Sequence, residues 1–254
     1  MKVRFLGTGT STGVPELGCT CEVCTSKDVH DNRLRSSVKV EIDDTSILID
    51  CTPDARQQLL NLPFKRIDAL LVTHEHFDHV GGIEDLRSFG RFGTIDIYVE
   101  SNVENALRMR MPYCFTNKHY AGIPDIELNH IDNSSPFYIN NIKVIPIRVM
   151  HHKLPILGFR IGDFAYLTDV KTVPQEEMSK LKDLDLLVIS ALRHTEHISH
   201  QTLEEAIYLS QSLKPDRTIF THMSHHIGLH KDVNANLPVN CELAYDGMEI
   251  ELLQ

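Results

Sequence analysis

Four side chains able to bind a metal ion crowd into the short segment THEHFDH, residues 73–79. This segment follows an apolar run that predicts a buried strand. In extended backbone, residues two apart point to the same side, so His74 and His76 can chelate one ion. Asp78 and His79 stand where the chain is expected to turn into a helix and can face a neighbouring position. Imidazole suits Zn, Mn and Fe, and a carboxylate extends the choice to harder ions. The segment therefore predicts metal binding rather than a solvated loop.

Three thiols form a second group in GCTCEVC, residues 18–24. Cys19, Cys21 and Cys24 are spaced for chelation, but a closed tetrahedral zinc site needs a fourth ligand. A redox pair is an alternative, although it would not need the third thiol. The other three cysteines are isolated, and we expect them to be buried as small apolar residues: Cys51, Cys114 and Cys241.

The composition limits the class of protein. The 254 residues include 15 His and 6 Cys, with 25 Lys+Arg against 35 Asp+Glu and a net charge of −10. A hydrophobic content of 42% excludes disorder, and no apolar run reaches the roughly 18 residues of a membrane span. The acidic balance disfavours wide contact with nucleic acid. The sequence reaches Gly7 too early for a signal peptide, so we expect a cytoplasmic chain with reduced thiols.

The elements that must position these residues alternate between strands and helices. The patterns predict strands at 3–6, 37–42, 46–50, 69–73, 96–99, 142–149, 158–168, 185–190 and 218–221. They predict helices at 54–60, 80–89, 102–111, 175–181 and 202–213, and a long loop at 111–124. Asp246-Gly247 predicts a hairpin between 242–244 and 248–252. No linker interrupts the pattern, so we expect one α/β domain over residues 1–254, with two β-rich halves.

The spacing of His74, His76, Asp78 and His79 resembles the signature of the metallo-β-lactamase superfamily. The resemblance implies an α/β fold of the αββα type, a sandwich of two mixed β-sheets with helices on the outer faces. It also implies a two-metal site with seven ligands: His74, His76, Asp78, His79, His151, Asp169 and His222. One ion would take His74, His76 and His151, the other Asp78, His79 and His222, with Asp169 bridging. His152 is adjacent to His151 and is an alternative ligand. Asp50, at the end of a predicted strand, could orient a ligand imidazole.

A narrower resemblance covers the run GTGTSTGVP, residues 7–15, which leads into the cysteines. This run is similar to the branch of the phosphoribosyl cyclic-phosphate phosphodiesterases of the bacterial phosphonate (carbon–phosphorus lyase) pathway. The branch implies a structural zinc in a loop at about residues 18–25, held by Cys19, Cys21, Cys24 and a late His. That His is His225, with His226 as the alternative. The same glycines resemble a dinucleotide-binding fingerprint, but Pro15 and the cysteines replace the helix which that fingerprint requires.

The resemblance implies a dinuclear metal-dependent hydrolase. Two divalent ions about 3.5–4 Å apart can activate water for attack on a phosphate. The resemblance points to His200 as the general acid or leaving-group stabiliser, and a structural role at a helix start is the alternative. We therefore expect a phosphodiesterase for a small cyclic phosphate or nucleotide-like diester. Asp78 and His200 would be catalytic, and the cofactors would be two ions of Mn, Zn or Fe and one structural Zn.

Three other functions compete with this one. A tRNA 3′-processing endoribonuclease shares the seven ligands but would carry a basic flexible arm, which we do not find in the sequence. A lactone or thioester hydrolase could use the same ions, yet leaves the cysteine cluster and His200 unexplained. A metal-storage protein would take up metal without turnover. The expected partner is a small anionic phosphodiester, without a membrane or nucleic acid, and a homodimer is a candidate assembly.

Overall fold

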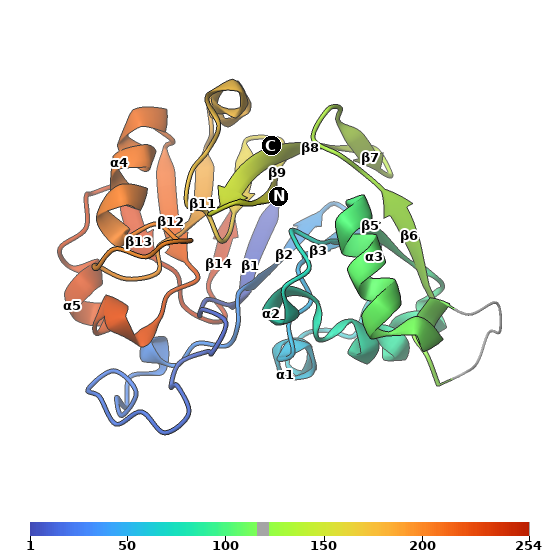
Figure 1. The fold of residues 1–254 in the computed structure, drawn as a ribbon, viewed down its shortest axis with the longest axis horizontal. Coiled ribbons are helices and arrows are strands. Elements are labelled where there is room, and N and C mark those ends of the chain that lie inside the picture. The colour runs from blue at the N-terminus through green and yellow to red at the C-terminus, as the bar shows by residue number, and fades with distance from the viewer. Residues whose placement is uncertain (116–121, 254) are drawn as a thin grey trace. The chain divides into compact units, whose positions relative to one another are not determined.

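The computed structural model describes residues 1–115 and 122–253, and the chain divides into two compact units. Unit 1 contains residues 1–6, 37–132 and 249–254, and unit 2 contains residues 7–36 and 133–248. The sequence passes between the units four times, so neither unit is one continuous stretch. Each unit is built on one mixed sheet of seven strands, and Figure 1 labels most of the strands. Among the described residues, no helix combines the length and apolarity that a bilayer span requires.

The sheet of unit 1 has the order β14-β1-β2-β3-β4-β5-β6. Its strands are β14 (Glu249–Glu251), β1 (Lys2–Gly7), β2 (Ser37–Ile42), β3 (Thr45–Ile49), β4 (Ala69–Leu71), β5 (Ile95–Val99) and β6 (Ile126–His130). β3, β4, β5 and β6 run parallel, whereas β2 and β3 form an antiparallel pair. All three residues of β4 are buried, as its continuous apolar run predicted.

Helices pack their apolar residues against this sheet. They are α1 (Ala55–Leu60), α2 (Phe77–Val80), the 3-10 helix η2 (Ile83–Phe92), α3 (Ser101–Arg110) and the 3-10 helix η3 (Pro112–Phe115). The core joins Leu70 and Ile97 of the sheet to Leu86 of η2 and Leu107 of α3, all four less than 1% exposed. Figure 1 shows α3 alongside β5. This packing fixes the end of β4, from which the predicted ligands of unit 1 emerge.

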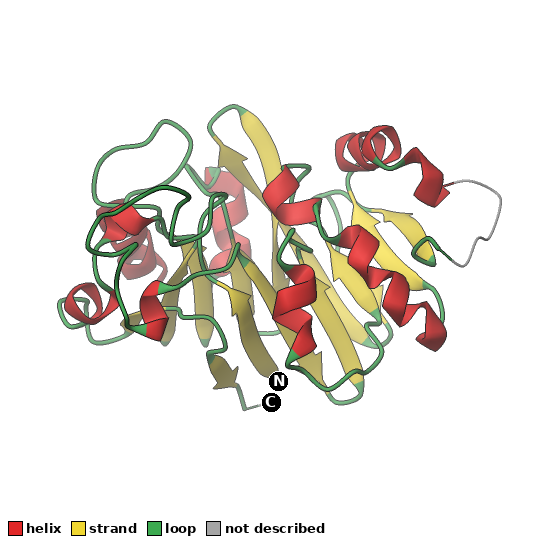
Figure 2. Cartoon of the chain, turned by 90° about the horizontal axis from the view of Figure 1, so that it is seen from below, coloured by secondary structure: helices red, strands yellow, loops and turns green. Residues whose placement is uncertain are grey.

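The sheet of unit 2 has the order β13-β12-β11-β10-β9-β8-β7. Its strands are β7 (Phe137–Ile139), β8 (Ile142–His151), β9 (Leu154–Ile161), β10 (Phe164–Leu167), β11 (Leu186–Ser190), β12 (Arg217–Thr221) and β13 (Cys241–Leu243). β10 to β13 run parallel, and β7 to β10 are antiparallel neighbours. The helices are η1 (Val29–Asp31), η4 (Gln175–Leu181), α4 (Leu203–Leu213), η5 (His225–Ile227) and α5 (His230–Asn234), and Figure 2 shows helices in red and strands in yellow.

α4 begins where its sequence predicts. Thr202 accepts a hydrogen bond from the backbone N–H of Glu205, and the Glu205 carboxylate accepts one from the N–H of Thr202. This reciprocal capping box satisfies two backbone donors that a helix start leaves without partners. The cap fixes the segment that ends at Thr202, which includes His200.

Two expectations about the elements are wrong. The predicted hairpin around Asp246 does not form, because β13 pairs with β12 and β14 pairs with β1. The Asp246 carboxylate instead accepts hydrogen bonds from the Thr8 hydroxyl and the Leu34 N–H, so it anchors a distant loop rather than a turn. The predicted helix 80–89 is divided into α2 and η2 at Gly81-Gly82. Gly82 packs closely against Thr52, and a Cβ there would overlap the carbonyl oxygen of Thr52. The predicted loop 111–124 contains η3, and residues 116–121 lie outside the described residues.

Candidate metal centres

The four predicted ligands of unit 1 gather just beyond the end of β4. His74 and His79 are fully buried. The ring centroid of His74 lies 4.5 Å from that of His76 and 4.2 Å from that of His79. His79 Nε2 lies 3.2 Å from Asp78 Oδ2, so these two atoms face the same point. Three imidazoles and one carboxylate are side chains of the kinds that could hold a metal ion.

The Asp50 carboxylate orients two of these imidazole rings, one directly and one through Thr73. His79 Nδ1 lies 2.7 Å from Asp50 Oδ2. The Thr73 hydroxyl donates to the same carboxylate at 2.9 Å, and His74 Nδ1 lies 3.0 Å from that hydroxyl oxygen. Because the Thr73 proton goes to Asp50, the His74 Nδ1–H donates to Thr73. Both imidazoles then carry their proton on Nδ1 and offer Nε2 to a metal ion. Thr73 is a functional residue that the sequence reasoning did not identify.

Unit 2 contributes a second buried group at the ends of its strands. His151 ends β8, Asp169 follows β10 and His222 follows β12, and the exposed fractions of the three are 9%, 2% and 1%. His222 Nε2 lies 3.0 Å from Asp169 Oδ1. His151 Nδ1 lies 2.9 Å from the carbonyl oxygen of Ser199, so its N–H donates there and Nε2 is the ligand nitrogen. The residues that the resemblance named in this unit are brought together.

The structure separates His151 from its neighbour His152. His151 is buried beside Asp169, whereas His152 is exposed in the turn between β8 and β9 with a φ of +56°. The His152 ring could contact the buried Asp169 carboxylate only if the backbone of the turn changed its conformation. The burial and orientation of the two rings therefore favour His151 as the ligand.

Three of the candidate polar residues have left-handed backbone. The φ angles are +60° at Asp50, +55° at Asp169 and +57° at His222. This conformation costs about 1–3 kcal/mol for a residue other than glycine, and it persists where the surroundings enforce it. Each residue lies within two residues of a strand end of its sheet, so the strand end aims the side chain. The backbone strain at these three positions lies on the candidate site, as is common at functional sites.

His200 belongs to the unit 2 group. Its ring stacks on His222 at 5.1 Å, and its centroid lies 4.6 Å from that of His151. A nitrogen of His200 comes within 4.8 Å of ligand atoms of His151 and Asp169. Its Nδ1 is buried with no hydrogen-bond partner in the described part of the chain. Burial, reinforced by neighbouring imidazoles, lowers the pKa of His200 to about 3, so the ring is neutral at pH 7.

The predicted zinc ligands form a separate cluster in unit 2. Ligand atoms of all four residues lie within 4.8 Å of one another: Cys19, Cys21, Cys24 and His225. Cys24 Sγ is 3.1 Å from His225 Nδ1. His226 lies on the other side of that ring, with its Nε2 2.9 Å from His225 Nε2. Three thiols and one imidazole are a common donor set of structural zinc, and the arrangement favours His225 over His226.

One short loop connects the two candidate centres of unit 2. Met223 follows His222 and lies two residues before His225, and its side chain is fully buried. The Met223 N–H donates to the Thr8 carbonyl, and the Thr10 N–H donates to the Met223 carbonyl, both at 3.0 Å. Gly9 is required between them, because a Cβ there would lie 2.9 Å from Arg33 Cβ. The glycine-rich run of residues 7–15 therefore holds the loop that presents both histidines.

The sequence matches the family described as Beta-lactamase superfamily domain over residues 45–223. The octanoyltransferase of Porphyromonas gingivalis is 45% identical over 251 residues, which are 98% of this chain and 51% of that protein. The ribonuclease Z of Microcystis aeruginosa is 29% identical over 169 residues, which cover 64% of this chain and 47% of that protein. The chain thus spans about half the length of these curated relatives.

A solved structure described as a new diphosphatase from the PhnP family is 38% identical, with a TM-score of 0.92, and the match covers 99% of this chain and 98% of that one. The short form of human tRNase Z has a TM-score of 0.74 at 21% identity over the whole of both chains, which shows a shared fold. The fold class predicted from the sequence is confirmed. The matched residues 45–223 include β3 to β12 and every predicted active-site ligand. The chain belongs to the metallo-β-lactamase superfamily.

Proposed function

We propose that this chain is a dinuclear metal-dependent phosphodiesterase acting on a small cyclic phosphate or nucleotide-like diester. The observation that carries the proposal is the similarity to the PhnP-family diphosphatase over almost the whole length of both chains. The cluster of Cys19, Cys21, Cys24 and His225 supports the same branch, because these are the four residues that the resemblance implies as zinc ligands.

In this proposal the two buried groups would hold a pair of ions. His74, His76 and His151 would be the ligands of one ion and Asp78, His79 and His222 those of the other, and Asp169 would be a ligand shared by both. The donor sets fit divalent Zn, Mn or Fe, since they combine neutral imidazoles with two carboxylates. When bound, the ions supply an activated water and Lewis-acid stabilisation of negative charge on phosphate.

The protein's own residues position the ligands and receive the leaving group. Asp50 and Thr73 keep His79 and His74 in the tautomers that bind metal. His200 is neutral, so it acts as a hydrogen-bond donor to the oxygen that departs from phosphorus rather than as a charged acid. The buried Nδ1 of His200 makes no protein hydrogen bond within residues 1–115 and 122–253, which leaves the ring able to serve a substrate atom.

Charge explains why the substrate is small. The whole chain carries −10, so its surface as a whole repels an extended polyanion. Two divalent ions outweigh the carboxylates of Asp78 and Asp169 and make the centre locally positive. A small diester that enters the centre gains this attraction without crossing a broad acidic surface.

The test is a substrate panel on protein reconstituted with Mn²⁺, Zn²⁺ or Fe²⁺. The panel contains bis(p-nitrophenyl) phosphate, a ribose cyclic phosphate, a 2′,3′-cyclic nucleotide, a dinucleoside diphosphate, precursor tRNA and an octanoyl thioester. We expect turnover of the small phosphoesters and loss of it on chelation. Turnover of precursor tRNA alone would assign a processing endoribonuclease. Turnover of the thioester alone would assign carbonyl chemistry, and metal uptake without any turnover would assign a binding protein.

A further inference from the structure

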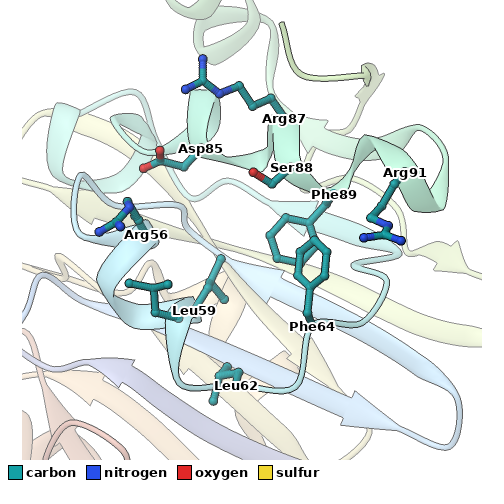
Figure 3. A pocket seen from close by; sticks show the side chains of 10 residues that line it. Arg56, Leu59, Leu62, Phe64, Asp85, Arg87, Ser88, Phe89 and Arg91 are labelled. Atoms are coloured by element: carbon teal, nitrogen blue, oxygen red, sulfur yellow. The ribbon is translucent and has the colours of Figure 1, made fainter. Parts of the chain in front are cut away.

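Unit 1 contains a groove that is lined by residues other than the candidate metal ligands. α1, the segment after it and η2 enclose a volume of about 680 Å³, and Figure 3 shows the side chains that line it. Pockets of roughly 300–1,000 Å³ are the usual size for specific ligand binding. The groove belongs entirely to unit 1 and uses none of the residues assigned to metal binding.

The floor of the groove is apolar and partly open to solvent. Leu59, Leu62, Phe64 and Phe89 line it, and the ring centroids of Phe64 and Phe89 are 4.8 Å apart. Phe64 is 50% exposed, and Leu60 at the edge is 60% exposed. A group of exposed large apolar side chains around a concave surface is typical of an interaction site. The floor can therefore accept apolar side chains of a ligand.

Three arginines rim this floor on a chain whose net charge is −10. Arg56 makes no ion pair with any residue of the described ranges. Arg87 makes only a long contact, 3.8 Å from its Nη1 to Glu84 Oε1, with both side chains about half exposed. Arg91 lies with its Cζ 5.8 Å from the Phe64 ring centroid. Figure 3 shows the three guanidinium groups at separate places around the floor rather than converging on one point.

We propose that this groove binds a peptide segment of a partner protein that combines apolar side chains with several carboxylates. The apolar floor fits leucine- or phenylalanine-type anchors, in the manner of a helix or strand laid in a groove. Separate arginines match carboxylates spaced along a chain, because each guanidinium can take its own carboxylate. A ligand with one anionic head would engage one arginine and leave the others unused.

The same charges disfavour self-association through this surface. In a twofold dimer the same patch meets itself, so the three arginines of one copy would approach the three of the other. No acid that lines the groove balances them except Asp85. The partner is therefore a different protein, and the binding is independent of phosphoester hydrolysis.

The test measures fluorescence anisotropy with a labelled peptide of about 16 residues that has Leu at positions i, i+3, i+4 and i+7 and Glu elsewhere. A matched peptide has Lys in place of Glu, and sodium octanoate serves as a competitor with one carboxylate. We expect the Glu peptide to bind, at least about tenfold more tightly than the Lys peptide, and more weakly at high salt. Each of Arg56→Glu, Arg87→Glu and Arg91→Glu should weaken binding about threefold to tenfold.

Two further variants complete the test. Phe64→Ser should weaken binding through the floor, and Lys182→Glu, an exposed charge reversal in unit 2, should leave it unchanged. Thermal melting checks that each variant folds, and phosphoesterase activity should be the same in all of them. Failure of the Glu peptide to bind at about 1 mM, or equal binding of both peptides, would overturn the proposal. Three other results would also overturn the proposal. Full competition by octanoate would assign the groove to a fatty acid, and tighter binding of anionic vesicles would assign it to a membrane surface. A dimer that Arg91→Glu dissociates would assign it to a second copy of this chain.

Discussion

Asp50 Oδ2 lies 2.7 Å from His79 Nδ1, and the exposed fraction of each side chain is at most 1%. The same carboxylate accepts the hydroxyl proton of Thr73, which in turn accepts the Nδ1–H of His74. One buried acid thus fixes two imidazoles, one directly and one through a hydroxyl. Burial raises the pKa of Asp50, and the interactions with His79 and the hydrogen bonds from Thr73 oppose that rise. The arrangement shows that this carboxylate is placed to orient ligands, not to contact a substrate.

Asp50→Asn should weaken metal binding by about 10- to 100-fold, because the amide holds the His79 tautomer less firmly. Competition with a chromophoric chelator measures the affinity for Zn²⁺ and Mn²⁺. Asp44→Asn removes an exposed carboxylate of the same unit and should have no effect. An affinity unchanged by Asp50→Asn would show that Asp50 has only a structural role.

Cys21→Ser should release one zinc per chain and lower the Tm by about 5–10 °C, while the catalytic ions stay bound. Cys21 is exposed, so the variant loses the ligand without losing packing. Cys114→Ser is the control, since Cys114 is buried and outside the cluster, and its variant should lose stability but no zinc. Elemental analysis and thermal melting measure the two effects, and a full zinc content in Cys21→Ser would refute the structural site.

His200→Ala should slow hydrolysis of esters with poor leaving groups by about 10²- to 10⁴-fold. Hydrolysis of a nitrophenyl ester should change by less than about tenfold, because nitrophenolate departs without a hydrogen-bond donor. His194→Ala, at a half-exposed ring, is the matched control and should behave as wild type. Equal losses for both substrates would exclude a role of His200 at the leaving oxygen.

Some features of this chain are readable from the sequence because they are local. β2 has the predicted bounds, Ser37–Ile42, since β-branched residues between polar turns specify a strand by themselves. The spacing of His74, His76, Asp78 and His79 and that of the three cysteines are likewise local patterns. The position of the histidine segment directly after a buried strand is what makes it a prediction of metal binding from these residues alone.

Other features depend on residues far apart in the chain. The hairpin predicted at Asp246-Gly247 is wrong. The Asp246 carboxylate instead accepts hydrogen bonds from Thr8 and Leu34, which are more than 200 residues away in the sequence. The role of Thr73 depends on Asp50 reaching it from β3, which periodicity cannot reveal. A helix at 80–89 is predicted, but the structure interrupts it at Gly81-Gly82, where Gly82 packs against Thr52, 30 residues earlier in the chain.

Asp246 should make folding stability fall as the pH rises from about 4 to 6. Burial raises its pKa to about 6, against hydrogen bonds from Leu34 and Thr8. The folded state then binds a proton more tightly than the unfolded state, so the stabilisation is full below pH 4 and is lost above pH 6. The free energy of unfolding of the wild type, relative to Asp246→Asn, should fall over this window by about 3 kcal/mol at most. Urea denaturation at several pH values measures the difference, and a flat or rising difference would contradict the buried carboxylate.

The most direct measurement compares wild type with Asp78→Ala in metal-reconstituted form, using bis(p-nitrophenyl) phosphate and elemental analysis of bound metal. Asp78 is partly exposed, so in metal-free form the variant should fold with the Tm of the metal-free wild type, as should the exposed control Asp44→Ala. We predict that the wild type binds two ions besides the zinc and turns over the ester. Asp78→Ala should lose one of the two ions and at least about 10³-fold in kcat/KM. Full turnover by Asp78→Ala, or a wild type that hydrolyses the ester with all metal removed, would contradict the two-metal phosphodiesterase.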